Sequence, residues 1–184
     1  LLLAGEGERA SSFFKQLIAK YPNAEDTPNA LFELGSLDFE NKKYGQARES
    51  FIEIVRSHKN SNVAGEAALM IGECFLAENK LADADKAFKG AADTFTDERI
   101  TSIATYRRGW VLFQKEDYTG AIRLFDDVLN KFPASDIASD ALFWKAEAYY
   151  KQGDFQNAFA GYNRFITTYP HSKRIADAYY GAGY

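Results

Sequence analysis

The chain is poor in the residues on which small cross-linked folds and metal sites depend. Its 184 residues include one cysteine, one methionine, two histidines and four prolines. A single cysteine, Cys74, cannot form an internal disulfide, and it leaves the redox compartment open. Neither His58 nor His171 has Cys, Asp or Glu at metal-ligand spacing. The sequence therefore predicts no metal site and no cofactor.

Long apolar runs and an excess of basic residues are also missing. No run of 18 apolar residues occurs, so we expect no membrane insertion within this chain. The formal net charge is −4 and the pI is near 5.3, with no basic stripe of the kind that a nucleic-acid-binding protein carries. We therefore expect no nucleic-acid partner.

Motifs for catalysis are absent or isolated. No glycine-rich phosphate loop is present. Ser12 and Lys15 spell a Ser-x-x-Lys hydrolase motif, but they fall within an expected helix and nothing else in the sequence supports that chemistry. Cys74 lies beside a packed Gly72–Phe75 stretch and is better interpreted as a small buried apolar residue than as a nucleophile. The sequence therefore predicts a protein that is not an enzyme.

What the chain does contain is a repeat of 37 residues. A glycine recurs at Gly35, Gly72 and Gly109, is replaced by Ala146 and returns at Gly183. The other repeating columns hold alanine or an aromatic residue, and they include Ala47, Ala84, Ala121 and Ala158, and Phe51, Phe88, Phe125 and Tyr162. A fixed period between about 20 and 50 residues is typical of solenoids, in which each unit buries its apolar face against its neighbours.

Each repeat holds two segments with helical spacing of apolar residues. In residues 44–58 and 118–132, apolar side chains recur every three to four residues and mark one face of a helix. First segments are expected at about 27–41, 63–78, 99–115, 136–151 and 173–184. Pro22, Pro133 and Pro170 follow an aromatic residue and close three of the helix pairs. Ser135 and Ser172, which follow two of these prolines, are candidate N-caps of the next helices.

The fold class predicted is all-α: a right-handed α-α superhelical solenoid of stacked antiparallel helix pairs with period 37. We expect one domain over residues 1–184, with a half repeat at 6–22, repeats at about 23–59, 60–96, 97–133 and 134–170, and a partial repeat at 171–184. The chain begins at Leu1 and its only methionine is Met70, so we expect a fragment or a processed product. Small residues at the glycine column are expected to face an alanine of the second helix and let two backbones approach closely. The aromatic residue four positions after that alanine is expected to fill the space beside the crossing.

The pattern resembles the tetratricopeptide repeat (TPR) family. Leu34-Gly35, Ala47 and Phe51 match its unit in the first complete repeat, and Gly109, Ala121, Phe125 and Pro133 match it in the third. The unit is three residues longer than the family's usual 34, and we expect the extra residues to lengthen the first helix of each pair. Phe132-Pro133-Ala134-Ser135 and Tyr169-Pro170-His171-Ser172 are similar to TPR proteins of the bacterial cell envelope, such as the Tol-Pal cell-division coordinator and the outer-membrane assembly lipoprotein.

The resemblance implies a binding surface on the first helices, which line the concave face of a TPR solenoid and hold peptide ligands there. Carried over by column, the residues expected in this groove are Phe32, Phe39, Leu69, Tyr106, Trp110, Phe113, Phe143, Tyr150 and Tyr180. They are aromatic or aliphatic, and the basic clamp that some TPR proteins use for a C-terminal carboxylate is missing. An apolar or proline-rich segment would suit such a surface.

Packing between repeats is the alternative for one of these columns. Phe32, Leu69, Tyr106, Phe143 and Tyr180 are apolar in every unit, as packing requires. Trp110 is different because its equivalents are Ser36, Glu73 and Glu147, so the scaffold does not need an aromatic residue there.

Three functions remain open at this point. The main hypothesis is a protein-binding scaffold that holds a peptide segment or partner protein in its groove, in the periplasm or at the envelope, with the cytoplasm as the alternative location. A second is a structural spacer that associates with copies of itself or with further repeats through exposed end repeats. A third is the docking arm of a larger enzyme.

Overall fold

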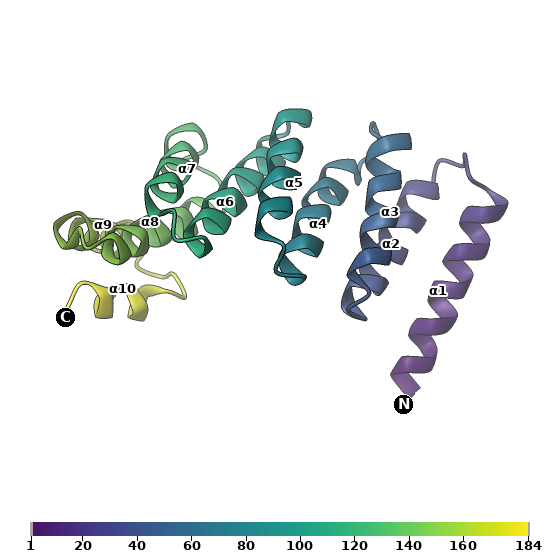
Figure 1. Cartoon of the computed structure of the whole chain (residues 1–184), viewed down its shortest axis with the longest axis horizontal. Coiled ribbons are helices and arrows are strands. Elements are labelled where there is room, and N and C mark those ends of the chain that lie inside the picture. Colours follow the sequence, from purple (N-terminus) through teal and green to yellow (C-terminus); the bar gives the residue numbers. More distant parts are fainter. Residues whose placement is uncertain (1, 184) are drawn as a thin grey trace. The chain divides into compact units, whose positions relative to one another are not determined.

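The computed structural model describes residues 2–183, with side chains from Gly7 onward. Its backbone is helical in this range, as predicted, and the helices join in the expected order (Figure 1). They form two compact units, one ending at Ala91 and the other beginning at Ala92. The first holds α1 (Leu2–Lys20), α2 (Thr27–Glu40), α3 (Tyr44–Ser57), α4 (Ala64–Ala77) and most of α5 (Leu81–Thr94). The second holds the end of α5, α6 (Glu98–Gln114), α7 (Tyr118–Lys131), α8 (Ala138–Gln152), α9 (Phe155–Thr168) and α10 (Ile175–Gly181).

Each of the four repeats predicted for residues 23–170 contains two helices. Neighbouring helices pack in sequence within each unit, α1 to α4 in the first and α6 to α10 in the second. First helices of successive repeats also touch, α2 with α4 and α6 with α8. This pattern confirms stacked helix pairs. The single domain expected over residues 1–184 stays a prediction.

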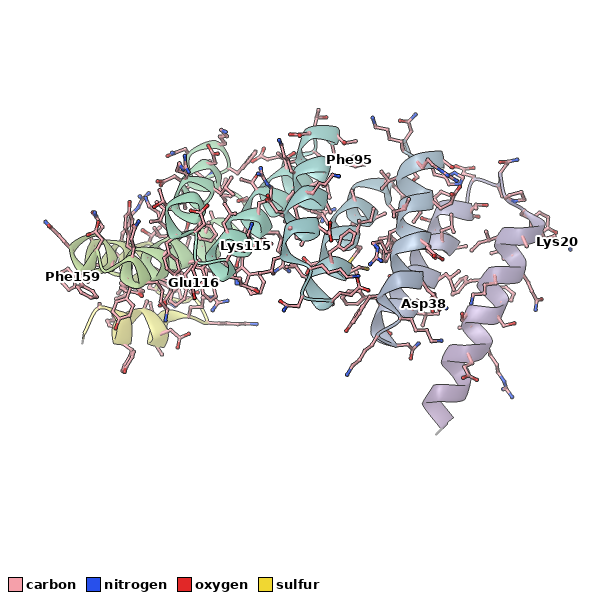
Figure 2. The ribbon with its side chains drawn as sticks, in the orientation of Figure 1. Lys20, Asp38, Phe95, Lys115, Glu116 and Phe159 are labelled. Atoms are coloured by element: carbon pink, nitrogen blue, oxygen red, sulfur yellow. The ribbon has the colours of Figure 1, made fainter. Side chains whose placement is uncertain are left out.

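Tight turns separate the two helices of each pair at a position that also repeats every 37 residues. Lys42, Asn79 and Glu116 adopt positive φ angles of 61°, 56° and 61°, and Gly153 has a φ of 83°. At each turn the next N–H donates to a carbonyl five residues earlier, as from Asp117 to Leu112 at 2.9 Å. This left-handed residue ends the first helix, and glycine is the residue that adopts it without steric cost. Figure 2 labels Glu116 at the turn between α6 and α7.

Aspartates cap three of the helices. The Asp97 carboxylate accepts a hydrogen bond from the Ile100 N–H at 3.0 Å, Asp117 accepts one from Gly120 at 2.9 Å, and Asp154 accepts one from Asn157 at 3.2 Å. The prediction that Ser135 and Ser172 are N-caps is wrong, because α8 and α10 are preceded by Ile137 and Arg174. The Ser135 hydroxyl instead donates to the Phe132 carbonyl at 2.8 Å and stabilises the turn before the helix.

The extra residues of the repeat build turns more than helix. Both α2 and α4 have 14 residues, the same length as the second helices α3, α5, α7 and α9, so the expected general lengthening is wrong. Only α6 is clearly longer, with 17 residues. Thr96 stands there where proline follows the closing aromatic elsewhere, and Asp97 caps the new helix at once. Lys59 also stands in place of proline, yet α4 begins only at Ala64, so the Asp97 cap and not the missing proline accounts for the early start of α6.

The core follows the repeating columns. Ala47, Phe51, Ala84, Phe88, Ala121 and Phe125 are fully buried. In the second unit the buried residues form two apolar clusters, one around Phe125 and one around Phe143, Tyr162 and Phe165. Gly183 follows α10 and has a φ of 80°.

Candidate functional site

A hollow of about 450 Å³ lies on the second unit between α8 and α10, with Tyr162 of α9 contributing to its wall. We call it the aromatic hollow. Its lining residues are Phe143, Trp144, Glu147, Tyr150, Tyr162, Arg174, Asp177, Tyr180 and Gly181. Three of them, Phe143, Tyr150 and Tyr180, are among the residues that the sequence predicted for the groove. The hollow is therefore the place where the described surface brings predicted groove residues together.

Buried aromatic rings form the base of the hollow. Phe143 is 4% exposed, and its ring packs edge-on against Trp144, Tyr162 and Phe165 with centroids 5.6–6.1 Å apart. Edge-to-face pairs at this separation add stability beyond the area that they bury. These rings hold one another in fixed positions, so the base is formed before any ligand arrives.

Exposed aromatic rings stand at the rim. Tyr150 is 49% exposed, and its ring rests edge-on against Phe155 at 5.5 Å. Tyr180 on α10 is 87% exposed. Tyrosine supplies rigid apolar area with a polar tip, which is why it is enriched at binding surfaces.

A charged hydrogen bond fixes the acidic wall. The Tyr162 hydroxyl donates to Glu147 Oε1 at 2.6 Å. Burial and this bond to a carboxylate raise the pKa of Tyr162 well above its usual value, so the phenol stays protonated. Asp177 adds a second, exposed carboxylate. The carboxylate of Glu147 is oriented by a rigid ring and is available to a ligand through its remaining lone pairs.

The one basic residue of the lining is already paired. Arg174 Nε donates to Asp140 Oδ1 at 2.7 Å, and the guanidinium lies 5.2 Å from the Phe143 ring centroid and 5.4 Å from that of Trp144. Because Asp140 balances this charge, Glu147 and Asp177 leave the hollow acidic overall. Such a surface favours a basic group over an acidic one.

Close packing holds α10 in place over the hollow. A Cβ on Gly181 would meet the Tyr162 ring at 2.5 Å, so only glycine allows this approach. Ala178, one turn earlier, is fully buried. The position of Tyr180, between these two contacts, is therefore set by the packing of its neighbours.

The other predicted groove residues divide by burial. Leu69 and Tyr106 are 8% and 5% exposed, and the Tyr106 ring packs on Phe125 with centroids 5.8 Å apart, so burial favours the packing alternative for both. Phe113 packs edge-on against Tyr118 and Trp144. Phe32 contacts the Phe51 ring and Phe39 contacts Tyr44, and both are half-buried.

Trp110 is half-buried. Its equivalent in the next repeat, Glu147, lines the aromatic hollow. The ligand-facing role of Trp110 stays a prediction.

Sequence reasoning missed Trp144, Tyr162, Arg174, Asp177 and Gly181. Two of them carried a usable signal. Arg174 stands in a column whose other members are Asp26, Val63, Ile100 and Ile137, and Trp144 stands in one that holds Glu33, Met70 and Arg107. The repeat columns assigned Tyr162 to the core. Its ring is buried there, but its hydroxyl donates to Glu147 on α8 at the wall of the hollow.

No group of three or more His, Cys, Asp or Glu residues in the described range is arranged to hold a metal ion. Within the same range, no helix is both long and apolar enough to cross a bilayer.

Two families match the sequence. Residues 32–99 match the tetratricopeptide repeat family, and residues 98–184 match the family described as an outer membrane lipoprotein, YfiO. Both matches agree with the resemblance inferred from the repeat columns. Among curated proteins, none matches the chain at the significance required.

Solved structures with similar folds include TPR proteins. A tetratricopeptide repeat protein from Parabacteroides merdae aligns with a TM-score of 0.73 at 19% identity, over 99% of this chain and 69% of the other. MamA from Desulfovibrio magneticus aligns with a TM-score of 0.68 at 16% identity, over 86% and 82% of the two chains. YrrB, described as a TPR protein with an unusual peptide-binding site, aligns with a TM-score of 0.65 at 18% identity, over 92% and 80%. At these identities the likeness shows the fold.

Proposed function

We propose that this chain is a tetratricopeptide repeat protein that acts as a non-catalytic scaffold and binds a peptide segment of a partner protein at the aromatic hollow. The observation that carries the proposal is that the hollow has buried aromatic rings at its base, around Phe143, and the exposed rings of Tyr150 and Tyr180 at its rim. A monomer rarely exposes large aromatic side chains around a preformed hollow without a partner for them.

The side chains that line the hollow limit the kinds of peptide that it can bind. Aromatic walls suit segments with apolar side chains or several prolines. A proline-rich segment loses little conformational freedom when it binds. Glu147 and Asp177 add a preference for a basic residue next to the apolar ones. A segment that ends in a free acidic C-terminus fits poorly, because Arg174 is already paired with Asp140.

An envelope role is the finer part of the proposal. Support comes from the match of residues 98–184 to an outer membrane lipoprotein family, which covers the whole aromatic hollow. We infer a bacterial protein of the periplasm or envelope in which this surface helps to hold an assembly together. Cell fractionation of the tagged native protein tests this location. Recovery in the periplasmic or membrane fraction is expected, and recovery in the cytoplasm would contradict it.

Selection from a displayed peptide library, followed by fluorescence anisotropy with the selected peptides, tests the binding proposal. We expect peptides rich in proline or aliphatic residues with at least one Arg or Lys. Tyr150→Ala and Tyr180→Ala should each weaken binding by about tenfold, the effect of losing a hot-spot aromatic. Phe159→Ala is the matched control, because Phe159 on α9 is also 49% exposed but does not line the hollow (Figure 2).

Two results would overturn this binding proposal. One is a library that yields no peptide specific for the chain. The other is equal binding by the wild type and both tyrosine variants, which would place the ligand elsewhere.

A second candidate function, self-association through an end repeat, has its own observation. Phe155 and Phe159 on α9 are 63% and 49% exposed, whereas Ile122, which is 37 residues before Phe159, is buried. An uncovered aromatic face suits a further helix pair or a second copy of the chain. Sedimentation velocity over a concentration series should then show dimers that Phe155→Ser with Phe159→Ser abolishes. A monomer at every concentration argues against it.

A further inference from the structure

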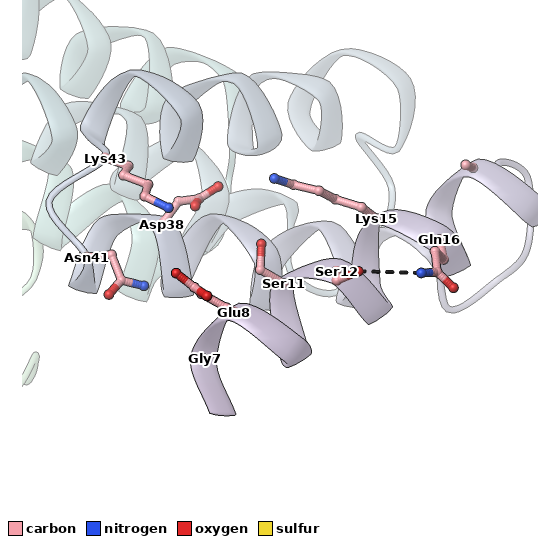
Figure 3. Close-up of a pocket in the computed structure, with 10 residues that line it drawn as sticks. Gly7, Glu8, Ser11, Ser12, Lys15, Gln16, Asp38, Asn41 and Lys43 are labelled. Atoms are coloured by element: carbon pink, nitrogen blue, oxygen red, sulfur yellow. Dashed lines mark hydrogen bonds between the residues drawn. The ribbon is translucent and has the colours of Figure 1, made fainter. Parts of the chain in front are cut away.

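A second hollow, on the first unit, contains a buried charge that the repeat scaffold does not require. It lies between α1 and α2, has a volume of about 560 Å³, and is drawn in Figure 3. We call it the α1–α2 pocket. The aromatic hollow belongs to the other unit and shares no residue with it.

Asp38 is the unusual residue of the α1–α2 pocket. It is only 3% exposed, and its equivalents in the following repeats are Phe75, Leu112 and Tyr149. A position that the fold fills with an apolar side chain three times holds a carboxylate here. Packing alone gives no reason for this exchange, because a buried carboxylate is costly unless it is paired.

No partner for that carboxylate exists among the residues that the structure describes. The Asp38 side chain makes no hydrogen bond and no ion pair there, although its main-chain carbonyl accepts from Lys43 N–H at 2.8 Å. Figure 3 shows the carboxylate pointing into the pocket, with Lys15 of α1 and Lys43 reaching toward it from two sides. Both lysines are exposed, and neither forms an ion pair with Asp38.

The remaining walls are polar. Glu8 and Ser11 face the pocket from α1, and Asn41 faces it from the turn after α2. Counting Glu8, Asp38, Lys15 and Lys43, the lining carries two charges of each sign. A neutral ligand or a simple anion would leave the buried Asp38 carboxylate without a partner, and a simple cation would pair with Asp38 but not with the two exposed lysines.

We propose that the α1–α2 pocket binds a free amino acid or a dipeptide, a ligand that carries an ammonium and a carboxylate close together. The ammonium lies against Asp38, because the most buried charge gains most from a counter-ion that replaces lost water. The ligand's carboxylate lies against Lys15 and Lys43 at the solvent side. Asn41 and Ser11 are placed to accept from or donate to the ligand's remaining polar groups.

Isothermal titration calorimetry on the intact chain tests this assignment, with glycyl-glutamate as the probe. Two modified probes separate the ends: N-acetyl-glycyl-glutamate lacks the ammonium, and glycyl-glutamine amide lacks both carboxylates. Free glycine and free glutamate distinguish a free amino acid from a dipeptide as the ligand. We expect the acetylated probe to bind at least tenfold more weakly than glycyl-glutamate.

Variants locate the site. Asp38→Asn keeps the shape of the side chain and should weaken the probe by at least tenfold, while Lys43→Gln should weaken it severalfold. Glu40→Gln is the control, because Glu40 is an exposed acid two residues from Asp38 that does not line the pocket. Asp38→Leu, which restores the residue of the Leu112 position, should raise the melting temperature of the free chain and abolish binding.

Three results would overturn the proposal. The first is the absence of heat from every probe up to millimolar concentration. The second is equal binding by the acetylated and free probes. The third is a lower melting temperature for Asp38→Leu, which would show that Asp38 serves an internal ion pair with Lys15 or Lys43. None of these results bears on the aromatic hollow.

Discussion

The ring of Phe51 on α3 lies directly over Gly35 on α2, so that a Cβ at residue 35 would come within 2.8 Å of two ring carbons. The same relationship recurs 37 residues later between Gly72 and Phe88 and again between Gly109 and Phe125. The sequence predicted that the aromatic residue four positions after the alanine of the second helix fills the space beside this crossing. Phe51 follows Ala47 by four positions and occupies that space.

Gly35→Ala should therefore destabilise the chain although alanine is the better helix former. The added methyl group forces the Phe51 ring to move within a packed core, which costs about 1–3 kcal/mol, and the gain in helix propensity offsets about 1 kcal/mol of that. Thermal unfolding followed by circular dichroism should show a lower melting temperature. Gly90→Ala, in α5, is the matched control, because a Cβ there meets nothing within 4 Å, and it should raise the melting temperature. Equal shifts for the two variants would contradict the packing account.

Trp110→Ala should weaken peptide binding while it leaves most of the stability intact. Its side chain is half-buried and its column is otherwise polar, so the scaffold does not depend on it. Phe125→Ala is the comparison, because Phe125 is fully buried and its truncation is expected to cost about 3–5 kcal/mol. Melting temperatures and the affinity for a selected peptide are the measurements. A loss of stability with Trp110→Ala as large as that with Phe125→Ala would assign Trp110 to the core.

Cys74 should resist modification in the folded chain. It is fully buried, as predicted, and burial raises the pKa of its thiol to about 11 from an ordinary value near 8.5. The sign follows from linkage: the neutral thiol is favoured in the folded state, so its contribution to stability is complete below pH 8.5 and is lost as the pH rises toward 11.

Two measurements check the Cys74 prediction. Reaction with a chromogenic disulfide reagent at pH 8 should be slow in buffer and fast in denaturant, because only the thiolate attacks and only the unfolded chain exposes it. Between pH 8.5 and 11, the stability of Cys74→Ala should fall less steeply with pH than that of the wild type, by up to about 1.4 kcal/mol per pH unit. Rapid labelling of the native chain would show that the site opens.

Much of the fold could be predicted because every unit repeats the same small and aromatic positions. Tyr44, Leu81, Tyr118 and Phe155 begin the second helices, where the spacing had placed them. Helix ends were predicted less well. Lys42 and Glu116 adopt a left-handed conformation that their side chains do not favour, although Asn79, in the same column, is a residue type that adopts it more often. The 17 residues of α6 begin directly after the Asp97 cap.

The candidate site was predictable only in part. Tyr150 and Tyr180 are exposed and Phe143 lies beneath them, but the same column reasoning also selected Leu69 and Tyr106, which pack inside. Departures from a column were the better signal. Asp38 stands where the next three repeats have Phe75, Leu112 and Tyr149, Arg174 stands where the preceding three have Val63, Ile100 and Ile137, and each lines a hollow.

By itself the sequence determined the repeat, the helix pairs and the residues that fill each crossing, because these depend on local periodicity and on side-chain size repeated in every unit. The tertiary structure alone decided which members of a column are covered and which reach solvent. That choice depends on the neighbouring helix: the Tyr106 ring of α6 packs on Phe125 of α7 and is buried, whereas Tyr150 of α8 rests on Phe155 of α9 and stays 49% exposed. The exposure of a side chain depends on which other helices pack against it, so the sequence of one helix does not determine it.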